Sequence, residues 1–293
     1  MTHIATLTTC HNRRALTLAS LANLKNQDLT PEVELSYFIV DDGSTDGTAA
    51  EIAERFPDVQ VITGNGVLYW AGGMRLGWET EIRQLAPDFL FVYNDDVRLY
   101  SSALGRLLKV GSTFENAEGH SRYAVVGSFS DRFGKTSYGG VVRGSTWHPY
   151  RFNRLDPPES GFIEADTVNM NACLIAKGAL DAIGFLDSHY VHSGADFDFG
   201  LRLKKAGGHI LVAAGYVGQC ERNREKKSAI NSFQGVSLRY REMIGPKGEP
   251  LKQHLYFCRK HGGLLWPIWF LARYLKPLVQ FARWWARREP ADL

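Results

Sequence analysis

The sequence is poor in cysteine and contains no long apolar run. Its 293 residues include four cysteines, which stand far apart and form no C-x-x-C pair. That spacing argues against a structural zinc site, and a reducing, cytoplasmic setting is the default expectation. The first ten residues, MTHIATLTTC, lack the charged region and apolar run of a secretory signal. No stretch reaches the roughly 18 to 20 uninterrupted apolar residues that a membrane-spanning helix requires.

Negative charge is missing from one part of the chain. Residues 259–288 contain seven Lys or Arg and no Asp or Glu, whereas the net charge of the whole chain is only +3. A basic stretch of this kind indicates an anionic surface or partner. The chain as a whole is close to neutral, and we expect no nucleic-acid partner.

Strand and helix patterns alternate through the first hundred residues, which predicts a parallel sheet covered by helices. The expected strands are residues 3–9, 34–40, 59–63 and 89–93, and the expected helices are 13–26, 45–56 and 71–85. Beyond residue 100 the pattern is mixed, with helices expected at 103–114 and 196–205 and strands at 123–130, 168–176 and 210–213. We therefore expect one α/β unit over residues 1–220 and a helical extension over residues 221–293.

Three of the expected strands run directly into polar sequence, at residues 8–12, 41–44 and 94–96. Ligands of open parallel sheets bind beyond the carboxyl ends of the strands. The three polar segments are therefore expected to form one composite site.

Asp95 and Asp96 are the candidate metal ligands. Adjacent carboxylates at a strand end repel one another and lose hydration, so a cation often sits beside them. Mg²⁺ or Mn²⁺ is typically held by one or two carboxylates together with substrate phosphates, and it would neutralise charge on a departing diphosphate. The alternative is a solvated turn, and these two residues alone do not decide between the interpretations.

Residues 40–48 read VDDGSTDGT and carry a second acidic candidate, Asp42. A carboxylate that follows a buried strand can accept hydrogen bonds from a nucleobase or a ribose. The same string also has ordinary turn and helix-capping chemistry, in Gly43, Ser44 and Thr45. We expect both, with Ser44 structural and Asp42 functional.

The third candidate is Asp196, in the string HSGADFDFGLR at residues 192–202. It falls at an expected helix start, where the helix dipole stabilises a carboxylate, and it could take a proton from an acceptor hydroxyl. The alternative is a helix cap with Asp198 and Arg202 paired four residues apart. His192 is either a partner that orients these groups or a loop histidine in solvent.

Taken together, these strings resemble glycosyltransferase family 2 over residues 3–220, in the family's order. The matching segments are Thr9 with His11, Asn12 and Arg13; VDDGSTDGT at 40–48; GNG at 64–66 with WAGGMRLG at 70–77; NDDV at 94–97; NACLIA at 171–176 with IGFLD at 183–187; and ADFDFGLR at 195–202. The best-matched subgroup is the bacterial rhamnosyltransferase-like enzymes of surface polysaccharide synthesis.

The resemblance implies an α/β fold of GT-A type and an inverting transfer from a nucleotide-diphosphate sugar. Residues 1–100 would bind the donor, dTDP-rhamnose or a UDP-sugar, and residues 101–220 a saccharide or lipid-linked acceptor. Asp96 would bind Mn²⁺ or Mg²⁺, Asp95 the ribose or the metal, and Asp196 would be the catalytic base. The implied donor-side residues are Thr9, His11, Arg13 and Asp42, and the implied acceptor-side residues are Trp70, His192 and Asp198.

Two positions depart from the family pattern. Ala195 stands where the family usually has Glu, although the Asp assigned as base remains. Met74 and Arg75 stand where the family often has Asn, so Arg75 either meets donor phosphate through bidentate hydrogen bonds or forms an ion pair on a helix surface. Trp70 either lines a sugar subsite or belongs to the core, since aromatic side chains do both.

The extension combines a cationic stripe with broad apolar faces rich in Trp. Arg273, Lys276, Arg283 and Arg287 recur at helical spacing, and Pro267 and Pro277 predict two short helices rather than one. Such a segment suits either peripheral contact of residues 264–288 with the inner face of the cytoplasmic membrane, or docking onto the catalytic part or a second subunit.

Two other functions fit parts of the pattern. A sugar nucleotidyltransferase also pairs carboxylates with Mg²⁺, but it would need a Gly-rich basic signature near the N-terminus, which His11-Asn12-Arg13 matches poorly. A catalytically silent protein that kept the fold and binds nucleotide-sugars is the alternative that Ala195 leaves open. Dinucleotide binding is rejected because residues 64–77 lack G-x-G-x-x-G spacing.

Overall fold

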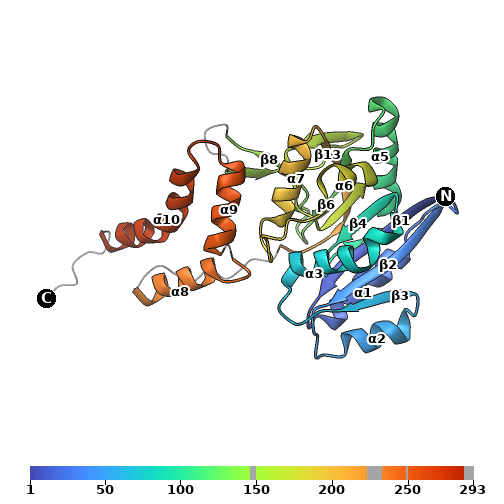
Figure 1. The fold of residues 1–293 in the computed structure, drawn as a ribbon, viewed down its shortest axis with the longest axis horizontal. Helices are drawn as coiled ribbons and strands as arrows, with labels where there is room; N and C mark the ends of the chain where they lie inside the picture. The colour runs from blue at the N-terminus through green and yellow to red at the C-terminus, as the bar shows by residue number, and fades with distance from the viewer. Residues whose placement is uncertain (146–149, 223–232, 249, 287–293) are drawn as a thin grey trace.

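A ten-stranded mixed sheet forms the centre of the protein (Figure 1). The computed structural model describes residues 1–145, 150–222, 233–248 and 250–286. The main order is β10-β13-β6-β12-β4-β1-β2-β3, with β5 added to β13 and β7 to β6. The strands are β1 (Thr2–Cys10), β2 (Val33–Asp41), β3 (Val59–Thr63), β4 (Phe89–Tyr93), β5 (Arg98–Leu99), β6 (Tyr123–Ser130), β7 (Thr136–Tyr138), β10 (Phe162–Ala165), β12 (Ala172–Ala176) and β13 (His209–Gln219).

The N-terminal half of the sheet is parallel: β4, β1, β2 and β3 lie side by side and run in one direction. The C-terminal half is mixed, because β12 runs antiparallel to both β4 and β6, while β13 is parallel to β6. A small second sheet is formed by β11 (Thr167–Val168), β8 (Gly140–Arg143) and β9 (Phe152–Arg154). The α/β class and the alternation of the first hundred residues, both predicted from the sequence, are confirmed.

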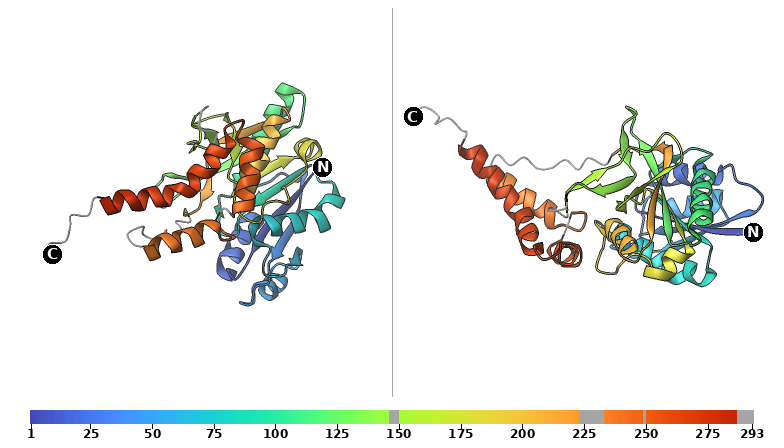
Figure 2. Two further views of the ribbon diagram at one scale, coloured as in Figure 1. Left: turned by 60° about the vertical axis from the view of Figure 1, so that its left-hand side comes forward. Right: turned by 90° about the horizontal axis from the view of Figure 1, so that it is seen from above.

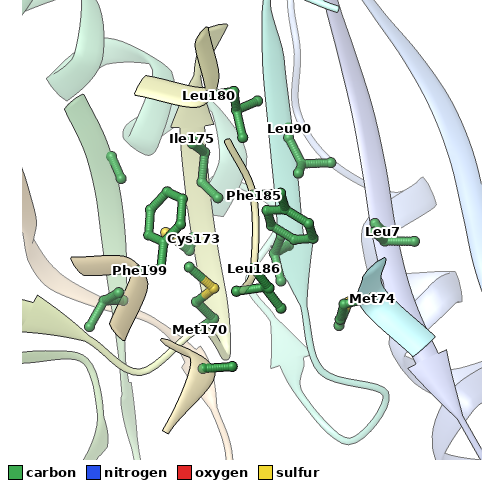
Figure 3. Close-up of a cluster of buried hydrophobic side chains, with 14 of the residues drawn as sticks. Leu7, Met74, Leu90, Met170, Cys173, Ile175, Leu180, Phe185, Leu186 and Phe199 are labelled. Atoms are coloured by element: carbon green, nitrogen blue, oxygen red, sulfur yellow. The ribbon is translucent and has the colours of Figure 1, made fainter. Parts of the chain in front are cut away.

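Helices cover both faces of the sheet. They are α1 (Arg14–Lys25), α2 (Thr48–Arg55), α3 (Tyr69–Gly77) with the π-helical turn η1 (Trp78–Ile82) and α4 (Arg83–Leu85), α5 (Ala103–Glu118), α6 (Lys177–Ile183) and α7 (Ala195–Lys205). Side chains of β4 alternate between two cores: Leu90 and Val92 pack with α3, α6 and α7, and Phe91 with α5. Figure 3 shows part of the first core, including Leu90, Met74 and Leu180. This burial on both faces explains why the central strands read as continuous apolar runs.

One predicted strand is wrong in a way that matters for the site. Residues 168–176 were expected to be continuous, but β11 and β12 belong to different sheets and are separated by Asn169, Met170 and Asn171. Two asparagines within three residues interrupt the apolar run, because their short polar side chains favour turns over strand ladders. A second predicted strand was too short, since β13 extends to Gln219 instead of ending at residue 213.

Glycines of the 64–77 string let α3 approach the ends of β1 and β2 closely. A Cβ added to Gly73 would lie 2.3 Å from Thr9 Oγ1 and 2.9 Å from Thr9 Cβ. A Cβ on Gly72 would meet Leu68 Cβ at 3.3 Å, a contact that a small shift relieves. The glycines of this string therefore allow α3 to pack closely against β1.

Gly73→Ala is expected to destabilise the protein by about 1–3 kcal/mol relative to Gly72→Ala, because overpacking against Thr9 outweighs the gain in helix propensity. The two variants make the same chemical change at neighbouring positions of one helix, so their difference isolates the contact. Urea unfolding followed by tryptophan fluorescence measures both. Equal midpoints would contradict the close packing of α3 on β1.

The C-terminal extension consists of α8 (Phe233–Ile244), α9 (Leu251–His261) and α10 (Trp266–Ala286), which project from one side of the sheet domain (Figure 2). The expected break at Pro277 is wrong: α10 continues through it. Pro277 removes one helical hydrogen bond, but its ring is buried, and this burial offsets part of that loss. Pro267 sits in the first turn, where proline is tolerated. Arg287 and Arg288 lie outside the described residues.

Within the described residues, α8, α9 and α10 included, no helix combines the length and the apolar character needed to span a bilayer. All four cysteines are buried free thiols.

Candidate active site

A cavity of about 830 Å³ opens at the carboxyl ends of β1, β2 and β4. Its wall is completed by the β11–β12 connection, by the N-terminal ends of α3 and α7, and by α9 and α10. Nine of the site residues predicted from the sequence line it: Thr9, His11, Arg13, Asp42, Trp70, Asp95, Asp96, His192 and Asp196. The three polar segments that were expected to form one composite site are thus brought together.

Arg13 holds the carboxylate pair that follows β4. Its Nη1 donates to Asp95 Oδ1 at 2.8 Å and its Nη2 to Asp96 Oδ2 at 2.6 Å. Burial raises the pKa of Asp95 to about 7 although Arg13 opposes the shift, and the neighbouring Asp96 charge adds to it. The two carboxylates therefore need positive charge nearby, and in this structure a guanidinium supplies it.

The chemistry of this pair suits a divalent cation that substrate helps to hold. Among the described residues no group of three or more His, Cys, Asp or Glu side chains is placed to hold a metal ion. Asp95 and Asp96 thus offer only the one or two carboxylates typical of Mg²⁺ sites that substrate phosphates complete. Asp95 Oδ2 is buried and has no hydrogen-bond partner among the described residues, so this carboxylate keeps an unused acceptor oxygen. The residues fit such an ion.

The carboxylate of Asp42 accepts hydrogen bonds from the loop that leads into α3. Its Oδ1 accepts from Gly66 N at 2.8 Å, and its Oδ2 accepts from Leu68 N and Tyr69 N at 2.9 and 3.0 Å. Three charge-assisted hydrogen bonds to backbone N–H groups fix both the carboxylate and the start of the helix. Asp42 therefore shapes the cavity by holding residues 66–69, in addition to lining it.

Thr9 and His11 are also tied to the neighbouring strand end. Thr9 Oγ1 donates to the carbonyl of Val40 at 3.1 Å, and His11 Nδ1 lies 2.6 Å from the carbonyl oxygen of Asp42. Ser44 is structural as expected, since its Oγ accepts from Asn12 N at 2.9 Å. Trp70 both lines the cavity and packs on the core, and its Nε1 donates to Asn94 Oδ1 at 3.0 Å.

Asp196 faces the cavity from the first turn of α7. One carboxylate oxygen accepts from Phe197 N at 2.9 Å, and further hydrogen bonds come from the Asn169 side chain and the Met170 backbone. Burial raises the pKa of Asp196 to about 6 against these hydrogen bonds. A carboxylate that is ionised at neutral pH and is only weakly solvated is well suited to accept a proton.

Two predicted site residues lie outside the cavity. Arg75 neither reaches the cavity nor forms a surface ion pair: its Nη1 donates to the backbone carbonyls of Asp187 and Tyr190, at 3.1 and 2.6 Å. These contacts engage Arg75 away from the cavity, and Arg202 binds the carbonyls of Ile183 and Phe185 in the same segment. The expected contact of Arg75 with donor phosphate stays a prediction. Arg75 therefore anchors the loop that precedes α7.

Asp198 is fully buried in a cluster of cations instead of facing an acceptor. It accepts from Arg202 Nε at 2.7 Å, as the i,i+4 pairing suggested, and contacts Lys260 Nζ and His261 Nε2, both at 2.8 Å. Burial opposes its charge, but these hydrogen bonds prevail and lower the pKa of Asp198. Lys260 and His261 belong to α9, so Asp198 fastens the extension to α7.

Sequence reasoning missed the contribution of the extension to the cavity. Lys247, Gln253, His254, Phe257 and Arg273 line its wall. The sequence offered docking onto the catalytic part as one alternative for this segment, but no pattern in it shows which residues face inward. Asn169 was missed because it lay inside an expected strand.

The sequence of the chain is similar to that of a known protein family. A family model described as Glycosyl transferase family 2 matches residues 6–167. The chain is 25% identical over 212 residues to an N-acetylglucosaminyl-diphospho-decaprenol L-rhamnosyltransferase found in two strains of Mycobacterium tuberculosis, and the match covers 63% of this chain. The matched region spans 66% of the length of those relatives. A crystal structure of S. aureus TarS, residues 1–349, aligns over the whole of this chain and 76% of that crystallised chain, with a TM-score of 0.48 and 14% identity.

Proposed function

The chain belongs to glycosyltransferase family 2, and from this we propose that it transfers a sugar from a nucleoside-diphosphate donor to a saccharide or lipid-linked acceptor, with inversion at the anomeric carbon. The observation that carries the proposal is one cavity that unites the carboxylate pair Asp95–Asp96 with Asp196. A diphosphate needs the first group and a hydroxyl nucleophile needs the second.

The reaction requires one displacement. Asp196 takes the proton of an acceptor hydroxyl, and the oxygen forms its bond to the anomeric carbon while the bond from that carbon to the diphosphate breaks. The nucleoside diphosphate departs with the bonding electrons, so the products are the inverted glycoside, the free nucleotide and a protonated Asp196. No carboxylate nucleophile on the enzyme is needed, in contrast to retaining glycosidases.

Asp95 and Asp96 would hold Mg²⁺ or Mn²⁺ in this proposal, and the bound ion would stabilise negative charge on the departing diphosphate. Arg13 lies against the same two carboxylates and fixes their orientation. Asp42, Thr9 and His11 form the wall where a nucleoside would sit, and Tyr69 and Trp70 add aromatic surface beside it.

We propose dTDP-rhamnose or a UDP-sugar as donor, and a lipid-linked saccharide in bacterial surface polysaccharide synthesis as acceptor. The name of the mycobacterial relative, which specifies rhamnosyl transfer to an N-acetylglucosaminyl-diphospho-decaprenol, supports a rhamnosyl donor and a lipid-linked acceptor. Residues 1–100 would bind the donor and residues 101–220 the acceptor, with residues from α9 and α10 as a further acceptor-side wall.

Release of nucleoside diphosphate from a panel of UDP-, GDP- and dTDP-sugars, in the presence of Mn²⁺ and a diphospho-lipid-linked saccharide, tests the proposal. Acceptor-dependent release from one donor is the expected result. Binding of a nucleotide in a thermal-shift assay without any release would favour the silent binding protein. Formation of a nucleotide-sugar and pyrophosphate from a nucleoside triphosphate and a sugar 1-phosphate would favour the nucleotidyltransferase.

A further inference from the structure

Helix α10 carries a continuous exposed apolar stripe. Its members follow one another at intervals of three, four, three, one and six residues, which at 100° per residue keeps them on one side of the helix, and each is about half exposed or more. They are Ile268 (56%), Leu271 (55%), Leu275 (52%), Leu278 (49%), Val279 (46%) and Trp285 (67%), and Leu264 (98%) and Leu265 (47%) precede them. Residues at this spacing share one face of a helix. This set is the outer face of α10.

The opposite face of α10 contacts the cavity and helices α8 and α9. Arg273 lines the cavity, Pro277 is buried, and Phe270 stacks on His254 of α9 at 5.6 Å between ring centroids. The backbone of Tyr274 accepts a hydrogen bond from Tyr240 of α8. Since these contacts fix the rotation of α10, the apolar stripe, whose residues are exposed, is held outward. Figure 2 shows α10 projecting from the sheet domain.

Charge around the outer face has one sign. Residues 250–286 contain no Asp or Glu. Lys276 and Arg283 are exposed and stand seven residues apart, so they lie on the same edge of the helix beside the stripe. An apolar face that includes Trp and is bordered by cations matches the interface of a bilayer with anionic headgroups.

We propose that the outer face of α10 docks on the surface of an anionic lipid bilayer, with the helix lying in the membrane plane. The stripe enters the boundary between headgroups and acyl chains, and Lys276 and Arg283 contact lipid phosphates. A second copy of the chain fits this face poorly. An antiparallel two-fold contact would set each edge against its own copy, cation against cation, with no acidic residue of α9 or α10 to compensate.

Docking in this orientation sets the catalytic cavity beside the membrane, because Arg273 on the inner face of the same helix forms part of the cavity wall. An acceptor that is anchored in the bilayer would then reach Asp196 without leaving it. The proposal concerns lipid binding alone and does not depend on sugar transfer.

Flotation of the full chain with phosphatidylcholine vesicles, with and without about 30% phosphatidylglycerol, tests the docking. Replacing Leu271 and Leu275 by Gln is expected to lower the partition coefficient about a hundredfold on both kinds of vesicle. Replacing Lys276 and Arg283 by Gln is expected to lower it about tenfold or more on the anionic vesicles only, and added salt should mimic this second effect.

The matched control replaces Leu16 and Leu85 by Gln, because both are exposed leucines of the sheet domain, at 45% and 46%. This control should float as the original protein does. Equal flotation of the Leu271/Leu275 variant and the original protein would overturn the proposal, as would absence of binding to anionic vesicles. Light scattering that shows a dimer, which the Leu271/Leu275 change dissociates without any vesicle binding, would assign the face to a second copy instead.

Discussion

Replacing Asp196 by Asn is expected to lower kcat by about 10²–10⁴-fold while nucleoside diphosphate binding stays unchanged. The amide keeps an oxygen that can accept from Phe197 N, so the start of α7 is preserved, but it cannot take a proton. Single-turnover transfer measures the loss, and the thermal shift produced by the nucleotide measures binding. Asp181→Asn, the same change at an exposed residue of α6, is the control. Turnover of Asp196→Asn near that of the control would refute the role of Asp196 as base.

The pH dependence of activity is a second test of Asp196 as the catalytic base. Burial raises the pKa of Asp196 to about 6, and only the ionised carboxylate can act as base. At saturating Mn²⁺, which would keep Asp95 ionised, activity should therefore be full above about pH 7 and fall about tenfold per unit below pH 6. The residual activity of Asp196→Asn should lack this acidic limb.

Asp198, on the same helix as Asp196, is expected to affect the stability of the contact between α7 and α9 and not the pH dependence of activity. Asp198→Asn removes a buried carboxylate from among Arg202, Lys260 and His261, so we expect a lower melting temperature. The acidic limb near pH 6 should remain, because Asp198 lies outside the cavity.

The sequence predicted the sheet well because buried strands and their polar ends are local features. The carboxyl ends of β1, β2 and β4 each carry a run of polar residues, and parallel pairing then forces these runs together. Six of the nine predicted cavity residues lie at these strand ends and share the cavity for this reason: Thr9, His11, Arg13, Asp42, Asp95 and Asp96. Trp70, His192 and Asp196 come to the cavity from α3 and from α7 with the loop before it, and the chemical role of each of the nine stays a prediction.

Errors arose where long-range contacts decide the outcome. Asp198 and Arg75 carry the same charges as predicted site residues that do line the cavity. Only the fold shows that Asp198 meets α9 and that Arg75 meets the carbonyls of Asp187 and Tyr190. Pro277 was expected to break α10, but burial of its ring against the packed extension is not encoded in local propensity. The cavity residues of α9 and α10 could not be found for a similar reason: an amphipathic helix with two apolar sides does not reveal which side faces inward.

The second large effect is expected at Asp96. Asp96→Ala should abolish metal-dependent turnover, a loss of about 10²–10⁴-fold, because a divalent ion contributes several kcal/mol of charge stabilisation to the departing diphosphate. Asp96 and Asp95 share the guanidinium of Arg13, so Asp95 keeps a cationic neighbour and the fold should survive. Calorimetric titration of Mn²⁺ into the protein saturated with nucleoside diphosphate measures ion binding separately from turnover. Asp58→Ala, at a solvent-exposed carboxylate paired with Lys25 far along the chain, is the control. If Asp96→Ala retained both Mn²⁺ affinity and turnover, Asp96 would not be a metal ligand. The two carboxylates would then serve only to bind Arg13.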